Sequence, residues 1–327
     1  MMISTELFEM FVLCETHISV LSSTGGTWKY GDSDLNRGVY GPDAWGNVAS
    51  ACRQADQSPI DIVTKEVESD SSLGELDITC DNDKGLFNGI LLNNGYEPVL
   101  TADNERGTCN LTGIALDNKN FELHDLNVHF GCDSDRGSEH TVDGKPFPAE
   151  LQLMFYNTEY GSYENAAPKQ DGLAAISVLL KFYLVGKSKN KALDSIVDQM
   201  DDVAVEGLLK CPKSTYFCTS SDSHQCLLPI NCIEGSSIPV YTPADNLTLA
   251  DLVPDLAEEH APFYTYKGSQ TTPPCYETVQ WIVMKNQVTV TKDQLLAFTK
   301  LTSAKGSECD NFRPTTPLNG RKVEANF

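Results

Sequence analysis

The sequence predicts one mostly β-sheet domain, built around a large twisted sheet with helices on its surface. Short runs that alternate apolar and polar residues, the period of a half-buried strand, occur along the whole chain of 327 residues. No internal repeat and no Pro-, Ser- or Gly-rich linker divides that length, although it would suffice for two average domains. We therefore assign residues 26–327 to a single domain.

Residues 1–25 are expected to be a leader or a poorly ordered N-terminus. A signal peptide usually has a basic start and an unbroken apolar run, whereas the apolar residues here are interrupted by Glu6, Glu9 and Glu15. The chain has no stretch of about 20 apolar residues, so we expect no membrane span.

The central strands are expected at Phe121–Phe130 and Glu150–Tyr156. Successive side chains of a strand point to opposite faces, which predicts two different surfaces. The core face carries Leu126, Val128 and Phe130 from the first strand, and Leu151, Leu153 and Phe155 from the second. The opposite face is polar and carries Asp125, Asn127, His129, Glu150 and Gln152.

Two helices are expected later in the chain. One is predicted to begin near Asp171–Ala174, and the other to cover about Ala192–Leu209. About 30 residues, 211–242, follow the second helix, and they contain four cysteines. Loops of this length in compact domains are usually functional or disordered, and the cysteines argue against disorder. We expect this Cys-rich insertion to be an interaction surface, for an unknown protein partner or for self-association. The alternative is an excursion that packs on its own domain.

The charge and the cysteines indicate the compartment and the kind of partner. The net charge of −22 makes binding to nucleic acid unfavourable, and is compatible with weak divalent-cation binding, a basic partner or simply a solvated acidic surface. Eleven cysteines are typical of a secreted, extracellular, disulfide-bonded protein, and the sequons at Asn110 and Asn246 predict a glycoprotein. The four cysteines at 211, 218, 226 and 232 are expected to pair among themselves, with a zinc cluster as the alternative.

Several motifs occur together and in order along the chain. They are Trp28–Gly31, Gln57–Asp61, Leu92–Gly95, Gly137–Asp143, Ala149–Leu151, Tyr264–Cys275 and Asn311–Pro314. Together they resemble the α-carbonic anhydrase family from about Trp28 to Val323. The resemblance implies that family's single-domain fold around a mixed sheet, and a disulfide between Cys52 and Cys275.

The resemblance also identifies the metal site and its loss. The family holds zinc with three histidines, and the matching positions here are Asn127, His129 and Gln152. Neutral amide oxygens are poor zinc ligands, so we expect no metal, no cofactor and no catalysis. Asp125 could contribute to an oxygen-rich site for Mn²⁺ or Ca²⁺, or could form an ion pair with His129.

Other family positions are kept or changed. Glu139 and Thr271 match a relay that orients zinc-bound hydroxide, and are expected to be vestigial. The segment Gly137–Thr141 is expected to brace the cavity floor, with His140 bonded to backbone or to Glu150. Tyr96 stands where fast members carry a proton-shuttling histidine. The wall of the CO₂ pocket is expected to contain Met154, Ala175, Gln270, Val279 and Trp281, with Gln270 in place of an apolar residue.

Three functions follow from these expectations. The favoured one is a secreted, inactive carbonic anhydrase-related protein with a binding, matrix or storage role. The second is a zinc-dependent carbonate dehydratase with substitute ligands, and the third is a carrier that holds a small ligand in the vacated cavity.

Overall fold

The computed structural model describes residues 27–81, 86–104, 107–182, 190–200, 241–299 and 310–327, together with four two-residue strands between 209 and 238. The expected leader at 1–25 lies outside these residues. Among the described helices, none has both the length and the apolar character needed to cross a membrane.

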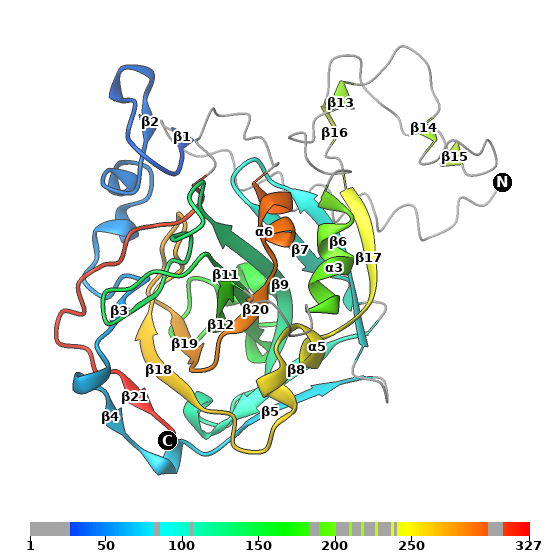
Figure 1. Cartoon of the computed structure of the whole chain (residues 1–327). Coiled ribbons are helices and arrows are strands. Elements are labelled where there is room, and N and C mark those ends of the chain that lie inside the picture. The colour runs from blue at the N-terminus through cyan, green and yellow to red at the C-terminus, as the bar shows by residue number, and fades with distance from the viewer. Residues whose placement is uncertain are drawn as a thin grey trace.

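One large sheet organises the described chain (Figure 1). Its strands follow the order β17 (Tyr241–Thr248), β6 (Leu86–Asn93), β7 (Pro98–Ala102), β9 (Phe121–Phe130), β11 (Ala149–Asn157), β12 (Leu173–Phe182), β19 (Val279–Met284), β18 (Phe263–Gly268), β21 (Glu324–Ala325) and β4 (Glu68–Ser69). Further strands pair beside this path: β5 (Leu76–Cys80) with β8 (Cys109–Gly113), β8 with β9, and β20 (Val288–Val290) with β12. Because β12 pairs with β19 in parallel and with β11 antiparallel, the sheet is mixed, as expected.

The helices are short and lie around the sheet. They are α2 (Tyr163–Ala166), α3 (Lys191–Val197), α5 (Leu249–Leu252) and α6 (Lys292–Phe298). The α6 helix begins with a capping box between Thr291 and Gln294, in which each side chain bonds the other residue's backbone N–H. The Gln294 amide also donates to Asp194 Oδ1 of α3, at 2.9 Å, and so ties the two helices together.

The two faces of the central strands pack into separate cores. The face predicted to be apolar joins the larger core, where Leu126 and Leu151 meet Leu193 of α3 and Phe298 of α6. Behind the polar face lies a smaller cluster that includes Met154, Ala175, Val279 and Trp281. The mostly β architecture with helices outside the sheet is confirmed.

The helices predicted from sequence are partly wrong. The segment expected to begin a helix near Asp171–Ala174 leads into β12, and the helix before it, α2, ends at Ala166. The second helix ends early, because α3 ends at Val197 and Leu209–Lys210 is the strand β13. Residues 173–180 are buried on both faces of the sheet, and such a continuous apolar run has no period that separates a helix from a strand.

The expected bridge between Cys52 and Cys275 is present, with an S–S distance of 2.06 Å. A second disulfide joins Cys80 to Cys109 across the β5–β8 pair, and Cys132 is also disulfide-bonded. Two strand pairs are described at the insertion: β13, which directly precedes it, with β16 (Ser237–Ile238), and β14 (Phe217–Cys218) with β15 (Cys226–Leu227). The predicted pairing of its cysteines lies outside what the structure describes.

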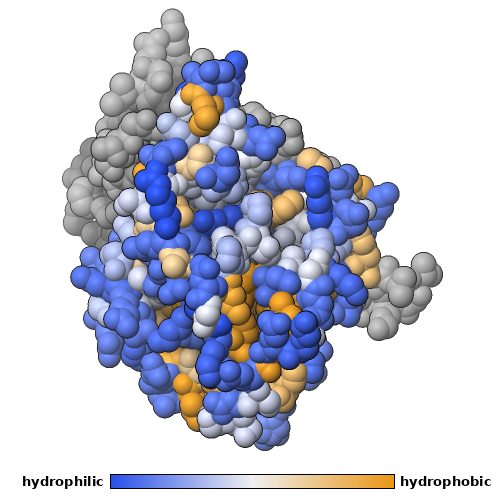
Figure 2. Space-filling view, turned by 90° about the vertical axis from the view of Figure 1, so that its left-hand side faces the viewer, coloured by the Kyte–Doolittle hydropathy of each residue, from blue (hydrophilic) through white to orange (hydrophobic). Residues whose placement is uncertain are grey.

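Seen from the side that carries β4 and β21, the surface is mostly hydrophilic, with apolar side chains visible in a recess (Figure 2). This surface agrees with the acidic composition.

Candidate functional site

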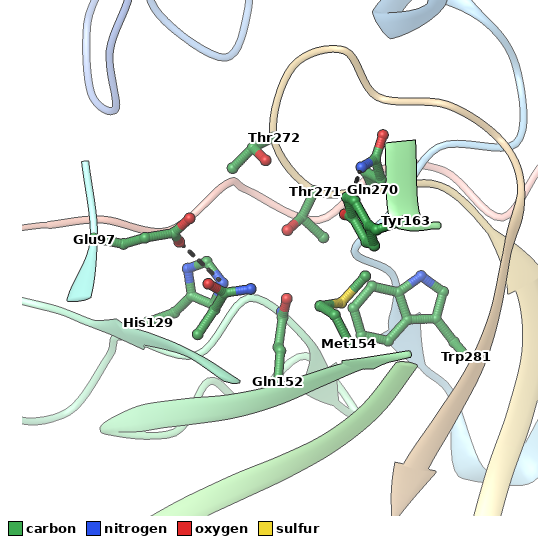
Figure 3. Close-up of a pocket in the computed structure, with 10 residues that line it drawn as sticks. Glu97, His129, Gln152, Met154, Tyr163, Gln270, Thr271, Thr272 and Trp281 are labelled. Carbon is green, nitrogen blue, oxygen red and sulfur yellow. Dashed lines mark hydrogen bonds and ion pairs between the residues drawn. The ribbon is translucent and has the colours of Figure 1, made fainter. Parts of the chain in front are cut away.

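The candidate site lies where the polar faces of β9 and β11 meet. Asn127 is directly opposite Gln152, and His129 is opposite Glu150. The register shifts between Met154, which pairs with Asp125, and Phe155, which pairs with Leu123, so His124 is the extra residue of a bulge in β9. The side chains border a cavity of about 40 Å³, whose lining is Glu97, Asn127, His129, Gln152, Met154, Tyr163, Gln270, Thr271, Thr272 and Trp281 (Figure 3).

His129 is fully buried and aims one ring nitrogen into the cavity. Its Nδ1 lies 2.8 Å from the backbone oxygen of Asn311; a carbonyl only accepts, so Nδ1 carries a hydrogen. Among the described residues, Nε2 has no hydrogen-bond partner; it lies 3.5 Å from Glu139 Oε2 and 3.7 Å from Glu97 Oε2. Burial opposes a charged imidazole, but Glu139 and Glu97 outweigh it and raise the pKa of His129 to about 9.

The two amides are committed to neighbouring carboxylates. Gln152 Nε2 donates to Glu139 Oε2 at 2.8 Å and to Glu150 Oε1 at 3.0 Å, and Asn127 Nδ2 donates to Asp125 Oδ1 at 3.0 Å. An amide donates only through its nitrogen, and both nitrogens are used by carboxylates. The neutral amide oxygens of Asn127 and Gln152 are therefore the atoms that remain to bind an ion. One imidazole and two amide oxygens do not fit the three-imidazole set that holds a catalytic zinc.

Glu97 is a cavity residue that the sequence did not reveal. Val99 of β7 pairs with Asn127, and Glu97 stands two residues earlier, on the same face. Its carboxylate accepts a 3.4 Å hydrogen bond from the Tyr30 hydroxyl and points toward His129 (Figure 3). Burial raises the pKa of Glu97, while His129 opposes that rise. Strand pairing, which sequence alone does not give, was the signal needed to find it.

Glu139 and Thr271, expected to be vestigial, do not form the family's relay with one another. Glu139 accepts bonds from the backbone N–H of Arg313, at 2.9 Å, and from Gln152. Thr271 lines the cavity, yet among the described residues it makes no hydrogen bond to Glu139. The Gln152 amide donates to the Glu139 carboxylate instead.

The predicted bracing of the cavity floor is present. The His140 ring bonds Glu150 Oε1 through Nδ1 and the Tyr266 hydroxyl through Nε2, at 2.8 and 2.6 Å. Glu150 also accepts the backbone N–H groups of Glu139 and His140 and the Ser177 hydroxyl. Burial alone would raise the pKa of Glu150, but His140 and these bonds lower it to about 2.

Asp125 does not form the ion pair with His129 that the sequence allowed as one of two roles. Asp125 lies 3.7 Å from His124 Nε2 and accepts from Asn127, whereas His129 faces Glu97 and Glu139. Removal from water, with Glu97 nearby, raises the pKa of Asp125 to about 8. A carboxyl that is largely protonated at neutral pH is a weak cation ligand.

The remaining predicted residues are only partly at the cavity. Met154, Gln270 and Trp281 line it, while Ala175 and Val279 are buried in the cluster behind it. Gln270 donates to the Tyr163 hydroxyl at 3.0 Å, and Tyr163 stacks on His124. Tyr96 stacks on Trp28 with 3.7 Å between ring centroids and is not part of the described lining.

The structure describes the side chain of one of the two sequon asparagines. Asn110 lies in β8, and its side-chain oxygen accepts a 3.1 Å bond from Asn120. Asn246 lies in β17, and its side chain is outside the described part of the chain. Glycosylation therefore stays a prediction.

Comparisons with known proteins agree with the fold. The family model described as eukaryotic-type carbonic anhydrase matches residues 40–327. Carbonic anhydrase 3 of Sus scrofa is 31% identical over 305 residues, which cover 92% of this chain and 98% of that protein. Carbonic anhydrase 3 of Equus caballus is 32% identical over the same shares, and that of Homo sapiens is 30% identical over 88% of this chain and 95% of its own.

Proposed function

Because the chain belongs to the eukaryotic-type carbonic anhydrase family, we propose that it is a secreted, catalytically inactive member with a binding, matrix or storage role. The proposal rests on the hydrogen bonds that two amide side chains make in the cavity. Asn127 and Gln152 stand at the family's ligand positions, and the amide nitrogen of each donates a hydrogen bond to a carboxylate. In an active member, zinc makes hydroxide available near neutral pH. The donor set here is too weak to hold that ion.

Zinc content and CO₂ hydration test the proposal together. The purified protein, dialysed against trace zinc, is expected to show no hydration above the buffer rate and no metal that depends on His129. Stoichiometric zinc that is lost in His129→Gln, together with a sulfonamide-sensitive rate, would overturn it.

The second candidate is a zinc-dependent carbonate dehydratase with a substitute ligand. Glu97 is the specific observation in its favour, because its carboxylate lies 3.7 Å from His129 Nε2. However, the same carboxylate and Glu139 lie close enough to His129 to pair with it as an imidazolium, and that form has no lone pair for a metal. If Glu97 were a ligand, Glu97→Gln would abolish both zinc binding and activity.

The cavity volume speaks against a carrier for organic molecules. Pockets for drug-sized ligands usually measure about 300–1,000 Å³, whereas this cavity has about 40 Å³. That space suits a few water molecules. A thermal-shift screen is expected to find no organic ligand that binds in the cavity. A ligand that stabilises the parent protein but not the cavity variant Gln270→Leu would contradict this.

The binding role is assigned to the Cys-rich insertion at 211–242. Its length, its cysteines and its apolar residues support a surface for a protein partner or for self-association. Deletion of residues 213–240 is expected to change the oligomer size seen by light scattering, or to abolish capture of a partner. An unchanged size and unchanged binding would refute this part of the proposal. The disulfides in the structure are compatible with secretion.

A further inference from the structure

We propose that Glu75, Glu259 and His260 form an exposed, exchangeable site for a divalent transition-metal ion such as Zn²⁺. Each side chain offers one ligand atom, and these atoms all lie within 4.8 Å of one another. Atoms bound to one zinc at about 2.0–2.2 Å are necessarily no more than about 4.4 Å apart. Small side-chain rotations therefore suffice to bring the three onto one ion.

The three residues come from two distant parts of the chain. Glu75 directly precedes β5, while Glu259 and His260 lie in the connection from η10 (Pro254–Ala257) to β18, at the lower edge of the view in Figure 1. His260 Nδ1 is in direct contact with Glu75 Oε1. A metal would take the place of this direct contact and add the Glu259 carboxylate.

One side chain holds the two segments together without any ion. Asn326 Nδ2 donates to the Gly74 carbonyl at 3.2 Å and to the Ala261 carbonyl at 3.0 Å, so it bonds the residue beside each ligand-bearing position. Asn326 is fixed in turn by Phe263, whose N–H donates to Asn326 Oδ1 and whose carbonyl accepts from Asn326 N–H. The backbone of the site is thus set before a metal arrives, which lowers the entropic cost of binding.

The chemistry of the donors selects the class of ion. Two carboxylates and one imidazole suit Zn²⁺ and its neighbours in the transition series better than Ca²⁺, which takes oxygen ligands only. Two carboxylates held this close also repel one another, and a divalent cation removes that repulsion. All three side chains are exposed, and His260 has 76% of its side chain open to solvent. Water would complete the coordination, so the ion should exchange freely.

A bound ion would act as a staple between β5 and the approach to β18. Ligands that bind only the folded state stabilise it. Zinc should therefore raise the melting temperature of the protein without producing any CO₂ hydration, which separates this site from the cavity.

The test is zinc titration of the full-length protein by calorimetry, after removal of metal with a chelator. We expect one zinc per chain at this site in the parent protein. Glu259→Gln and His260→Asn should each weaken its affinity by about tenfold or more, since even outer-shell changes cost roughly 10- to 100-fold. Asparagine is chosen because His260 has φ +67°, and Asn tolerates this left-handed conformation.

Glu258→Gln is the matched control, because Glu258 is an exposed neighbour outside the cluster. It should bind zinc like the parent. Zinc affinity that is unchanged in Glu259→Gln and His260→Asn would overturn the site. If zinc binding were instead abolished by His129→Gln, the ion would lie in the cavity, and the proposed catalytic inactivity would be refuted as well.

Discussion

Although burial opposes the charge, two carboxylates hold His129 as a cation in the cavity where we propose that a metal site has been lost. Its imidazole lies between the carboxylates of Glu97 and Glu139, at 3.7 and 3.5 Å. Asn127 bonds Asp125 and Gln152 bonds Glu150, and carboxylates are also the partners that orient metal-bound histidines. Under the proposed loss of the metal site, only its donors have changed and its carboxylate surroundings persist.

This arrangement predicts how zinc could be restored. Asn127→His with Gln152→His should bind zinc, because Asp125 and Glu150 remain as acceptors for the new imidazoles. Hydration of CO₂ should stay absent, since Glu97 can take the open position on the ion. Adding Glu97→Ala should yield slow, sulfonamide-sensitive hydration, measured by stopped flow. A folded triple variant that binds no zinc would show that the cavity has changed shape.

Asp125 predicts how stability depends on pH. Its pKa is raised from its usual 3.8 to about 8, so the folded state holds a proton that the unfolded state has released between those values. Stability should therefore fall as pH rises from about 4 to 8, by at most about 1.4 kcal/mol per pH unit. Asp125→Asn should flatten this slope in urea unfolding at pH 5–8. An unchanged slope in the variant would contradict the assignment.

At the scale of elements, Glu150 joins the loop before β10 (Thr141–Val142) to β11 and β12. It accepts from the His140 ring, from Gln152 and from Ser177. All of these groups are buried, so a missing acceptor leaves several donors unsatisfied.

Glu150→Gln should accordingly destabilise the fold by about 3 kcal/mol. Ser177→Ala removes one bond only and should cost about 1 kcal/mol. Because the pKa of Glu150 is lowered to about 2, its contribution is complete above its usual value of 4.5 and is lost as pH falls toward 2. Chemical unfolding of both variants at pH 7 and pH 3 checks this; equal losses in the two variants would refute it.

The central strands show what the sequence could and could not predict. The alternation of Leu126, Val128 and Phe130 correctly placed Asn127 and His129 on the opposite face. The strand β12 was missed because both its faces are buried, which removes the period. Glu97 was missed because its place in the cavity depends on the pairing of β7 with β9.

At the scale of the whole molecule, one disulfide spans most of the described chain. Cys52–Cys275 links residues 223 positions apart, whereas Cys80–Cys109 closes 29. In the chain-entropy model, the longer loop should stabilise by roughly 2 kcal/mol more. Cys52→Ser with Cys275→Ser should thus lower the melting temperature more than Cys80→Ser with Cys109→Ser. The reverse order in calorimetry would show that local strain or packing dominates.

We propose that this family member does not hydrate CO₂. Total zinc is an indirect test, because the exposed site at Glu75, Glu259 and His260 would also bind the ion. The most direct measurement is therefore the sulfonamide-sensitive rate of CO₂ hydration by the zinc-equilibrated protein, followed by stopped flow. We expect a rate equal to that of buffer alone. A rate above buffer that a sulfonamide abolishes would contradict it.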